Sequence, residues 1–317
     1  MKLIVFFLAC LALPADAMSE ELSVRFSSVI LSHDDLQRTQ VGKLRFRGGL
    51  DLRSRDSRFG GLSGLAISAD GARLTAVGDR GVWFTALLEF DKAGWLTGLS
   101  NARLRPVIRP DGKSLQGRSL TDSESIAPLT DGTLVVGFEQ RHRLRRFAGP
   151  GAAANFFGAP AALRASPPNG GAEAVTRLWG NQLLVLSERR EARPGVAAGW
   201  IGPGQEWRAV GFRKSGIFRP VGAATRDDGT VFILERRFTT IGGIASRISY
   251  LPAKNIASGI VFEGQALAEL SAPLVADNFE GIAVRPGKLG KTLIYIVSDD
   301  NFHDLQRTLL LMFSLAE

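Results

Sequence analysis

The chain has 317 residues, 45% of them hydrophobic and 22% charged, and a chain of this length can bury a large core. Its only cysteine, Cys10, lies in the N-terminal leader described below, so the remaining chain has no disulfide, thiolate metal site or cysteine nucleophile. The net charge of +8 is spread along the chain without a recognition motif, so we expect no nucleic-acid partner.

The N-terminus has the three parts of a secretory signal peptide. Lys2 is a minimal positive region, residues 3–13 are apolar, and the ADA sequence at 15–17 is a small-x-small cleavage site. This apolar run is shorter than the ~20 residues of a membrane-spanning helix, which disfavours the alternative of an uncleaved anchor. We therefore expect a periplasmic or secreted protein, with one domain at 18–317 and no membrane span.

Two strand-like segments follow the leader. Residues 22–26 and 43–47 alternate in polarity, as expected for strands with one buried face. We expect these strands to complete a blade begun by the C-terminus, which would close a ring of sheets and remove free edges.

A hairpin pattern begins after residue 60. Residues 64–78 predict two short strands joined by Asp70-Gly71, a pair that supplies the positive φ of a tight turn. Residues 84–90 and 95–99 predict a third and a fourth strand. One repeat therefore supplies four strands.

The clearest copy of this hairpin is the segment 122–143. Asp131-Gly132 provides the turn, and an acid stands at each outer end, Glu124 before one strand and Glu139 after the other. The ends of an antiparallel hairpin are neighbours, so both carboxylates should lie at one edge of the sheet.

Acids recur at the ends of the other hairpins. The paired acids are 15 residues apart in two copies and 19 apart in a third, whereas two copies have Ser63 and Val221 in place of the leading acid. The acids at hairpin ends are Asp79, Glu124, Glu139, Glu173, Glu188, Glu235, Glu280, Asp299 and Asp300.

The spacing of the hairpins indicates the fold class. Equivalent points lie 61, 49, 48 and 59 residues apart, and periods of ~40–50 residues with several strands each are typical of β-propeller blades. No segment after the leader has a sustained helical period. We predict a monomeric, all-β propeller of four-stranded antiparallel blades, six in number, with five and seven as alternatives.

The repeated acids should converge at one rim of the central channel, where they repel one another unless a cation intervenes. One compensation is Ca²⁺, which takes six to eight oxygen ligands; the expected ligands are Asp79, Glu173, Glu188, Glu235, Glu280 and Asp299. The other is pairing with the arginines that follow several of the acids, namely Arg80, Arg141, Arg189 and Arg236. Both alternatives remain open from the sequence.

Four residues of the clearest hairpin are candidates for catalysis: Glu124, Glu139, Arg141 and His142. The carboxylates would act as ligands or base, and the arginine and histidine would contact an anionic group. Ser63 is a weak candidate nucleophile, because the G-x-S-x-G pattern fails at Leu65.

Residues 55–315 resemble the bacterial phytase-like family, whose domain is described as the esterase-like activity of phytase. The motifs that carry the resemblance are Phe59–Leu65, Val77–Gly81, Asp122–Ala127, Phe138–Arg143, Asn278–Ala283 and Ser298–Phe302. The resemblance implies hydrolysis of phosphate or other esters, and the architecturally similar propeller phytases use a calcium cluster that binds substrate phosphates. Their ligand motifs do not map onto this chain residue by residue, so the resemblance points to no ligands beyond the repeated acids.

The expected function is metal-assisted hydrolysis of a small anionic ester. A bound metal would bridge substrate oxygens and lower the pKa of an attacking water. The alternative is a non-catalytic envelope propeller that binds a ligand or a protein partner, with the acids and arginines as a salt-bridge framework. A calcium-dependent rise in melting temperature would favour the first function.

Overall fold

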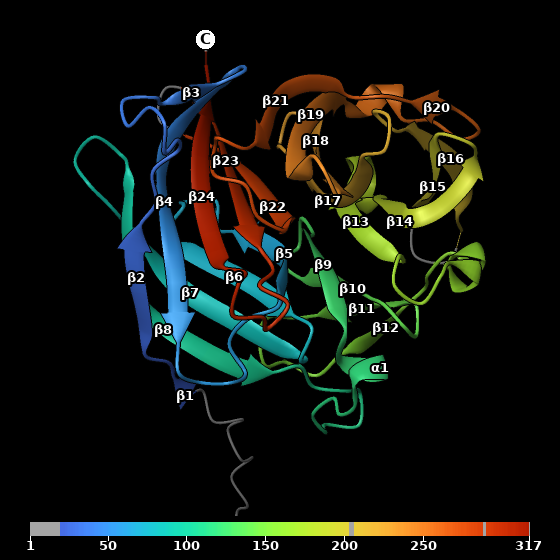
Figure 1. The fold of residues 1–317 in the computed structure, drawn as a ribbon. Coiled ribbons are helices and arrows are strands. Elements are labelled where there is room, and N and C mark those ends of the chain that lie inside the picture. Colours follow the sequence, from blue (N-terminus) through green and yellow to red (C-terminus); the bar gives the residue numbers. More distant parts are fainter. Residues whose placement is uncertain (1–19, 203–205, 288–289, 317) are drawn as a thin grey trace, which may run out of the picture.

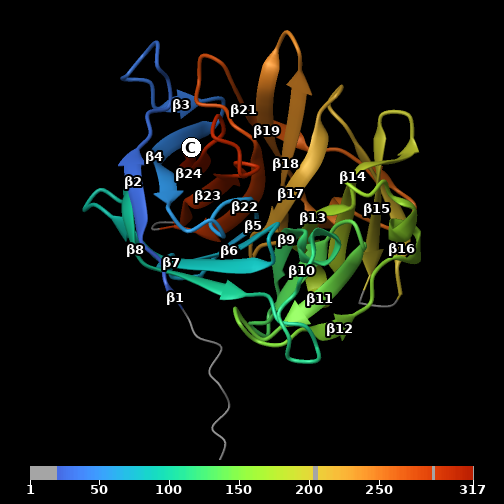
Figure 2. The same cartoon turned by 60° about the horizontal axis from the view of Figure 1, so that its bottom comes forward.

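The computed structural model describes residues 20–202, 206–287 and 290–316, which form five sheets arranged around a common axis (Figures 1 and 2). The expected signal peptide, residues 1–17, lies outside the described residues. Among the described residues, no helix is long and apolar enough to cross a membrane.

Blades 1 to 3 follow the chain from the axis outward. Blade 1 contains β5 (Leu62–Ile67), β6 (Arg73–Gly78), β7 (Val82–Phe90) and β8 (Leu96–Pro106), with β1 (Glu20–Glu21) at its edge. Blade 2 contains β9 (Ser123–Pro128), β10 (Leu134–Phe138), β11 (Arg143–Phe147) and β12 (Asn155–Phe157). Blade 3 contains β13 (Ala172–Arg177), β14 (Leu183–Arg193), β15 (Val196–Gly202) and β16 (Arg208–Arg213), with β20 (Val261–Phe262) added in parallel.

Blades 4 and 5 complete the ring. Blade 4 contains β17 (Arg219–Thr225), β18 (Thr230–Thr239), β19 (Gly243–Pro252) and β21 (Gln265–Ser271). Blade 5 contains β22 (Phe279–Pro286), β23 (Thr292–Ser298), β24 (Thr308–Leu315), β4 (Leu44–Ser54) and β2 (Val24–Ser28), with β3 (Gln40–Val41) beside β4. The helices are short: α1 (Arg118–Thr121), η1 (Ala161–Ala165), η2 (Trp179–Asn181) and η3 (Ala253–Asn255).

The N- and C-terminal parts of the chain share blade 5. Strand β4 pairs with β24, with Leu50 opposite Leu310 and Phe46 opposite Phe313; in Figure 1 the blue strand lies directly beside the red one. The prediction that the N-terminal strands complete a blade begun by the C-terminus is thus confirmed. Because they enlarge the fifth hairpin's sheet instead of building another, the propeller has five blades, and the preferred number of six was wrong.

The Asp-Gly pairs form the turns expected of them. In blade 2, Gly132 has a φ of 80° and Asp131 Oδ1 accepts a hydrogen bond from the Thr133 amide at 3.0 Å. Gly71 and Gly229 have φ values of 79° and 82° at the equivalent turns. Glycine adopts this left-handed conformation without the Cβ clash of other residues, which explains the recurring pair.

The hydrophobic core is divided among the five interfaces between blades. Each interface contains one cluster of buried apolar side chains drawn from the two blades that meet there. Between blades 1 and 2, for example, Trp83 and Phe147 pack edge to face with their ring centroids 5.2 Å apart. Burial of these faces fixes the blades around the axis, so the hairpin ends are held at one end of the central channel.

Candidate functional site

Each innermost strand has a β-bulge at the same place. In blade 2, Ser125 pairs with Gly137 and Ser123 pairs with Phe138, which leaves Glu124 without a partner in the ladder. The same shift leaves one residue unpaired in each of the other blades: Ser63, Glu173, Val221 and Glu280. A bulge redirects the side chain of the extra residue, and these residues all belong to the strands around the axis.

The second strand of each blade pairs with the inner strand on both sides of the bulge. The residue that follows the first pair beyond the bulge provides a second ring of positions, occupied by Asp79, Glu139, Glu188, Arg236 and Asp299. The Asp79 amide donates to the Gly61 carbonyl oxygen, and the Glu139 amide donates to the Asp122 carbonyl oxygen, each on the adjacent inner segment. The two rings together form the candidate site.

Glu235 does not belong to this site, contrary to the prediction. Glu235 pairs with Pro220 in blade 4, and Ser187 pairs with Ala172 at the equivalent place in blade 3. The residue after Glu235, Arg236, therefore occupies the position that an acid has in the other four blades. The Glu235 carboxylate instead accepts from Ser249 at 3.2 Å and lies 3.9 Å from Arg247 on its own sheet. Counting along the strand misses this shift, because the bulge sets the register.

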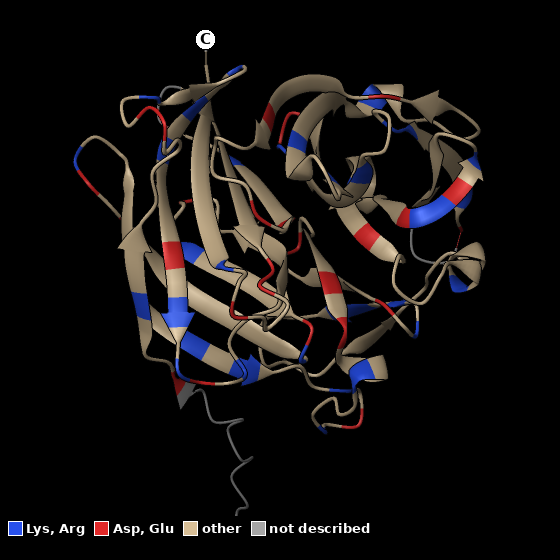
Figure 3. Cartoon of the chain, in the orientation of Figure 1, with Lys and Arg blue, Asp and Glu red and all other residues tan. Residues whose placement is uncertain are grey.

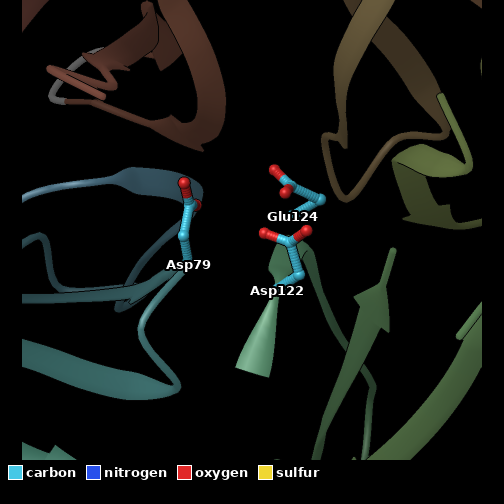
Figure 4. A group of neighbouring side chains, drawn as sticks. All are labelled: Asp79, Asp122 and Glu124. Carbon is cyan, nitrogen blue, oxygen red and sulfur yellow. The ribbon is translucent and has the colours of Figure 1, made fainter. Parts of the chain in front are cut away.

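Two trios of carboxylates meet in the site. Asp79, Asp122 and Glu124 each offer an oxygen within 4.8 Å of the others, and so do Glu124, Glu173 and Glu280. In Figure 4 the carboxylates of Asp122 and Glu124 lie next to each other, and Asp79 stands on the neighbouring segment of blade 1. Glu124 belongs to both trios and therefore lies at the centre of the acidic group.

The second trio comes from three blades. Glu124 and Glu173 lie on β9 and β13, where Figure 3 shows acidic positions in red, and Glu280 lies on β22. These three residues line a narrow cavity with room for about 10 Å³ between the innermost strands. That volume is close to what a single water-sized particle requires.

Polar neighbours hold several of the acids in place. Ser63 Oγ lies 3.3 Å from both Asp79 Oδ1 and Glu280 Oε2. Asn278 Nδ2 donates to Glu280 Oε1 at 3.0 Å and to Asp299 Oδ2 at 3.3 Å. The carboxylates are thus oriented by neutral donors as well as by one another.

Burial and mutual repulsion raise the pKa values of the clustered carboxyls. The pKa of Asp79 is raised to about 8, mainly by burial and next by the charges of Glu280 and Asp122. The same two causes raise further pKa values well above the usual carboxyl range, those of Glu124, Glu173 and Asp299. Without a bound cation these carboxyls therefore favour protons, and a cation would relieve the same repulsion.

Glu139 is held by the backbone of the following blade. Its Oε1 accepts hydrogen bonds from the amides of both Gly170 and Gly171. Burial raises the pKa of Glu139, and these two hydrogen bonds oppose that rise. The carboxyl is therefore fixed in direction beside Glu173, to which it is hydrogen-bonded.

Arginine compensates one side of the site. Arg236 Nη1 donates to Glu280 Oε1 at 2.6 Å, and its Nη2 lies 3.3 Å from Glu188 Oε1. Arg189 also contacts Glu188, at 2.9 Å. Within the described ranges, no arginine or lysine forms a salt bridge with Asp79, Asp122, Glu124 or Glu173. Arginine pairing and cation binding, the two alternatives left by the sequence, thus apply to different acids.

Several predicted partners lie outside the acidic site. The Arg80 guanidinium lies over the Phe302 ring at 3.5 Å and donates to the Ser57 carbonyl. Arg141 is exposed and lines a separate pocket. His142 Nε2 lies 3.0 Å from the Pro167 carbonyl oxygen. Among the described residues, Arg141 and His142 form no hydrogen bond or ion pair with the site carboxylates, although the His142 ring lies beside Gly171, whose amide donates to Glu139.

Asp122 was missed as a site residue. It precedes Glu124 by two positions, and strand alternation places such residues on one side of the chain. That spacing was the available signal. Ser63 was considered only as a nucleophile, whereas the structure places it as a donor between two acids.

The donor set of the trios fits a hard divalent cation. All the ligand atoms are carboxylate oxygens, which suit Ca²⁺, Mg²⁺ or Mn²⁺. Two oxygens bound to one Ca²⁺ can lie up to about 5 Å apart, twice the metal–oxygen distance, and the oxygens of each trio satisfy this limit. Asp79, Asp122, Glu124, Glu173 and Glu280 are thus suitable ligands.

The fold resembles solved structures of other proteins. An α-L-arabinofuranosidase from Podospora anserina, solved in complex with cellotriose, aligns with a TM-score of 0.54 and 13% identity, over 86% of this chain and 97% of the other. The catalytic domain of a Coprinopsis cinerea α-L-arabinofuranosidase aligns with a TM-score of 0.49 and 13% identity, over 87% of this chain and 99% of the other. At these identities the likeness concerns the fold alone. No curated protein matches the sequence.

A family match covers most of the chain. Residues 57–302 match the phytase-like family, described as the esterase-like activity of phytase. The matched segment begins before the first inner hairpin and ends beyond Asp299, so it includes every acid of the two rings. With the match covering well over half of the sequence, the chain belongs to the phytase-like family.

Proposed function

We propose that this protein is an exported, cation-dependent hydrolase of small anionic esters, with phosphate esters as the first class to test. The observation that carries the proposal is the pair of carboxylate trios that share Glu124. Membership of the phytase-like family, which is described by an esterase-like activity, supports the ester class. The signal-peptide pattern at 1–17 supports export.

The acids would hold the cation, with Ca²⁺ as the preferred candidate. A bound divalent cation supplies positive charge that attracts an anionic ester and polarises its oxygens. Glu124, Glu173 and Glu280 project from bulges on three different blades, so a shared ligand would also tie these blades together. Arg236 keeps the Glu280 carboxylate in place from the side of blade 4.

Glu139 is the candidate general base. Its carboxyl is oriented by two backbone amides, and burial raises its pKa above the ordinary carboxyl value. A base whose pKa lies near the working pH is the most effective in proton transfer. Its role would be to accept the proton of an attacking water at the edge of the cation site.

The test is an assay of the exported form with p-nitrophenyl phosphate and p-nitrophenyl acetate, in Ca²⁺ and in EDTA. We expect calcium-dependent hydrolysis, with preference for the phosphate ester. Glu124→Gln should lose the activity because it removes the ligand common to both trios. Glu235→Gln is the matched control, since Glu235 is equally buried but lies outside the site.

Other results would point elsewhere. Equal loss of activity in both variants would show that general destabilisation is responsible. Calcium-dependent stabilisation without turnover of any ester would identify a cation-stabilised binding propeller instead. Activity that is unchanged by EDTA and by Glu124→Gln would overturn the proposal.

A further inference from the structure

A second cavity lies between blade 2 and the segment 107–120 that leads into it, and no carboxylate of the trios lines it. It has a volume of about 430 Å³, within the range of about 300–1,000 Å³ for small-molecule sites. Its polar lining consists of arginines, namely Arg109, Arg141, Arg143 and Arg145, and no acidic residue lines it. Its walls are apolar and include Val107, Leu115, Phe138 and Phe147. We call it the arginine pocket.

Strand alternation explains why the arginines gather there. Along β11, residues 143, 145 and 147 share one face, whereas Leu144 and Arg146 have the other. Leu144 packs in the core between blades 2 and 3, and Arg146 pairs with Asp131. The face toward blade 1 therefore has two arginines and a buried phenylalanine.

The guanidinium groups are held in place by backbone and aromatic contacts. Arg143 donates to the carbonyl oxygens of Arg141, at 2.9 Å, and Leu120, and its guanidinium lies 4.1 Å from the centre of the Phe138 ring. Arg145 donates to the Leu144 carbonyl at 3.1 Å and lies 5.7 Å from the centre of the Phe156 ring. Each guanidinium has five N–H donors, so both retain donors for a ligand.

The pocket has excess positive charge. Among the residues that the structure describes, Arg141, Arg143 and Arg145 form no salt bridge, and Arg109 alone pairs with an acid, Asp111. The pKa of Arg143 is lowered to about 10, mainly by burial and next by the neighbouring charges of Arg145 and Arg141. The charge of Asp122 offsets part of this repulsion at Arg143, and a bound anion would relieve the remainder.

We propose that the arginine pocket binds an organic anion, a molecule with a sulfonate-, phosphate- or carboxylate-type head on an apolar or aromatic body. The arginines would bind the head by charge-assisted hydrogen bonds. The side chains of Val107, Leu115 and Phe147 would cover the body. No carboxylate lines this pocket, and its binding of an anion does not depend on the proposed hydrolysis.

Isothermal titration calorimetry with naphthalene-2-sulfonate tests the proposal, because this anion contains no ester or phosphate bond to hydrolyse. We expect one site per chain, with affinity that falls as salt is raised from 50 to 500 mM. Neutral naphthalene-2-sulfonamide and inorganic sulfate should each bind at least about tenfold more weakly, since each lacks one half of the ligand.

Substitutions locate the binding. Arg143→Met and Arg145→Met should each weaken naphthalene-2-sulfonate about tenfold, and Arg25→Met, an exposed arginine on β2, should leave it unchanged. Arg141→Met provides a second variant for which unfolding is not expected, because its exposed side chain makes no hydrogen bond in the described structure; a several-fold loss is expected there. Absence of binding, equal binding of the sulfonamide, or affinity unchanged in Arg143→Met and Arg141→Met would overturn the proposal.

Discussion

Arg236 in blade 4 donates to Glu280 in blade 5, with Nη1 and Oε1 2.6 Å apart. The same guanidinium lies 3.3 Å from Glu188 in blade 3, so one residue links three blades at the acidic end of the channel. Although burial opposes its charge, the carboxylates of Glu280 and Glu188 raise the pKa of Arg236. It occupies a position that has an acid in every other blade.

Loss of Arg236 should therefore destabilise the propeller. Arg236→Met leaves Glu280 and Glu188 buried without their shared partner, and breaking a buried pair in this way costs about 3–5 kcal/mol. Arg189→Met is the control, because the Arg189 side chain is 47% exposed, against 21% for Arg236, and among the described acids it forms an ion pair with Glu188 alone. The control should lose less than about 1 kcal/mol. Urea denaturation of both variants in EDTA measures the difference, and similar losses would contradict this account.

Stability without metal should decrease as pH rises. The pKa values of the clustered carboxyls are higher in the folded protein than in the unfolded chain, where they lie near 4. Between about pH 4 and pH 8, where Asp79 titrates, the folded state therefore binds more protons, and the free energy of unfolding falls with increasing pH. Thermal melts in EDTA from pH 5 to pH 8 should show a falling midpoint. Asp79→Asn should flatten this dependence, and a midpoint that rises over the range would contradict the raised pKa values.

Calcium should reverse this loss at neutral pH. A ligand that binds only the folded state at 100 times its Kd stabilises by about 2.7 kcal/mol. With an unfolding entropy of about 0.6 kcal/mol/K for a chain of roughly 300 residues, the midpoint should rise by about 4 °C. Melts with and without Ca²⁺ at pH 7.5 measure the shift. Glu124→Gln should abolish it and Glu235→Gln should retain it.

Small residues on the innermost strands should be intolerant of enlargement. Gly281 follows the bulge of β22, and a Cβ there would lie 2.5 Å from the Ser63 backbone oxygen of blade 1. Since backbone must shift to make room, Gly281→Ala should cost about 1–3 kcal/mol. Gly149→Ala is the control, because a Cβ at that position meets no atom within 4 Å. Chemical denaturation compares the two, and equal stability would show that the strands adjust freely.

Closure of the ring should depend on β24. Leu311 lies on this strand between β4 and β23 and is fully buried, whereas Leu305 in the preceding loop is 87% exposed. Leu311→Ala should lower the free energy of unfolding by about 2–5 kcal/mol. Leu305→Ala should change it by less than about 0.5 kcal/mol. Denaturation curves measure both, and a small effect at Leu311 would indicate that the closing sheet contributes little.

The repeat of hairpins, their Asp-Gly turns and the pairing of the two ends of the chain followed from the sequence. Strand alternation and turn chemistry are local properties, so segments such as 124–139 indicate their own structure. The convergence of Glu124, Glu173 and Glu280 also followed, because equivalent points of a repeat meet around a common axis. The paired acids at the two ends of a hairpin were recognisable because they are 15 or 19 residues apart.

The tertiary structure decided which residues fill the rings. The bulges set the register of the inner hairpins, and in blade 4 this register places Arg236, and not Glu235, in the site. The N-terminal strands pair with the C-terminal strands in the sheet of blade 5, so the ring has five blades. Charge compensation was also decided in three dimensions, because Arg236 reaches acids 44 and 48 residues away, whereas Arg141 points into a different pocket. Such contacts depend on how separate blades pack, and that packing is not encoded in any one segment.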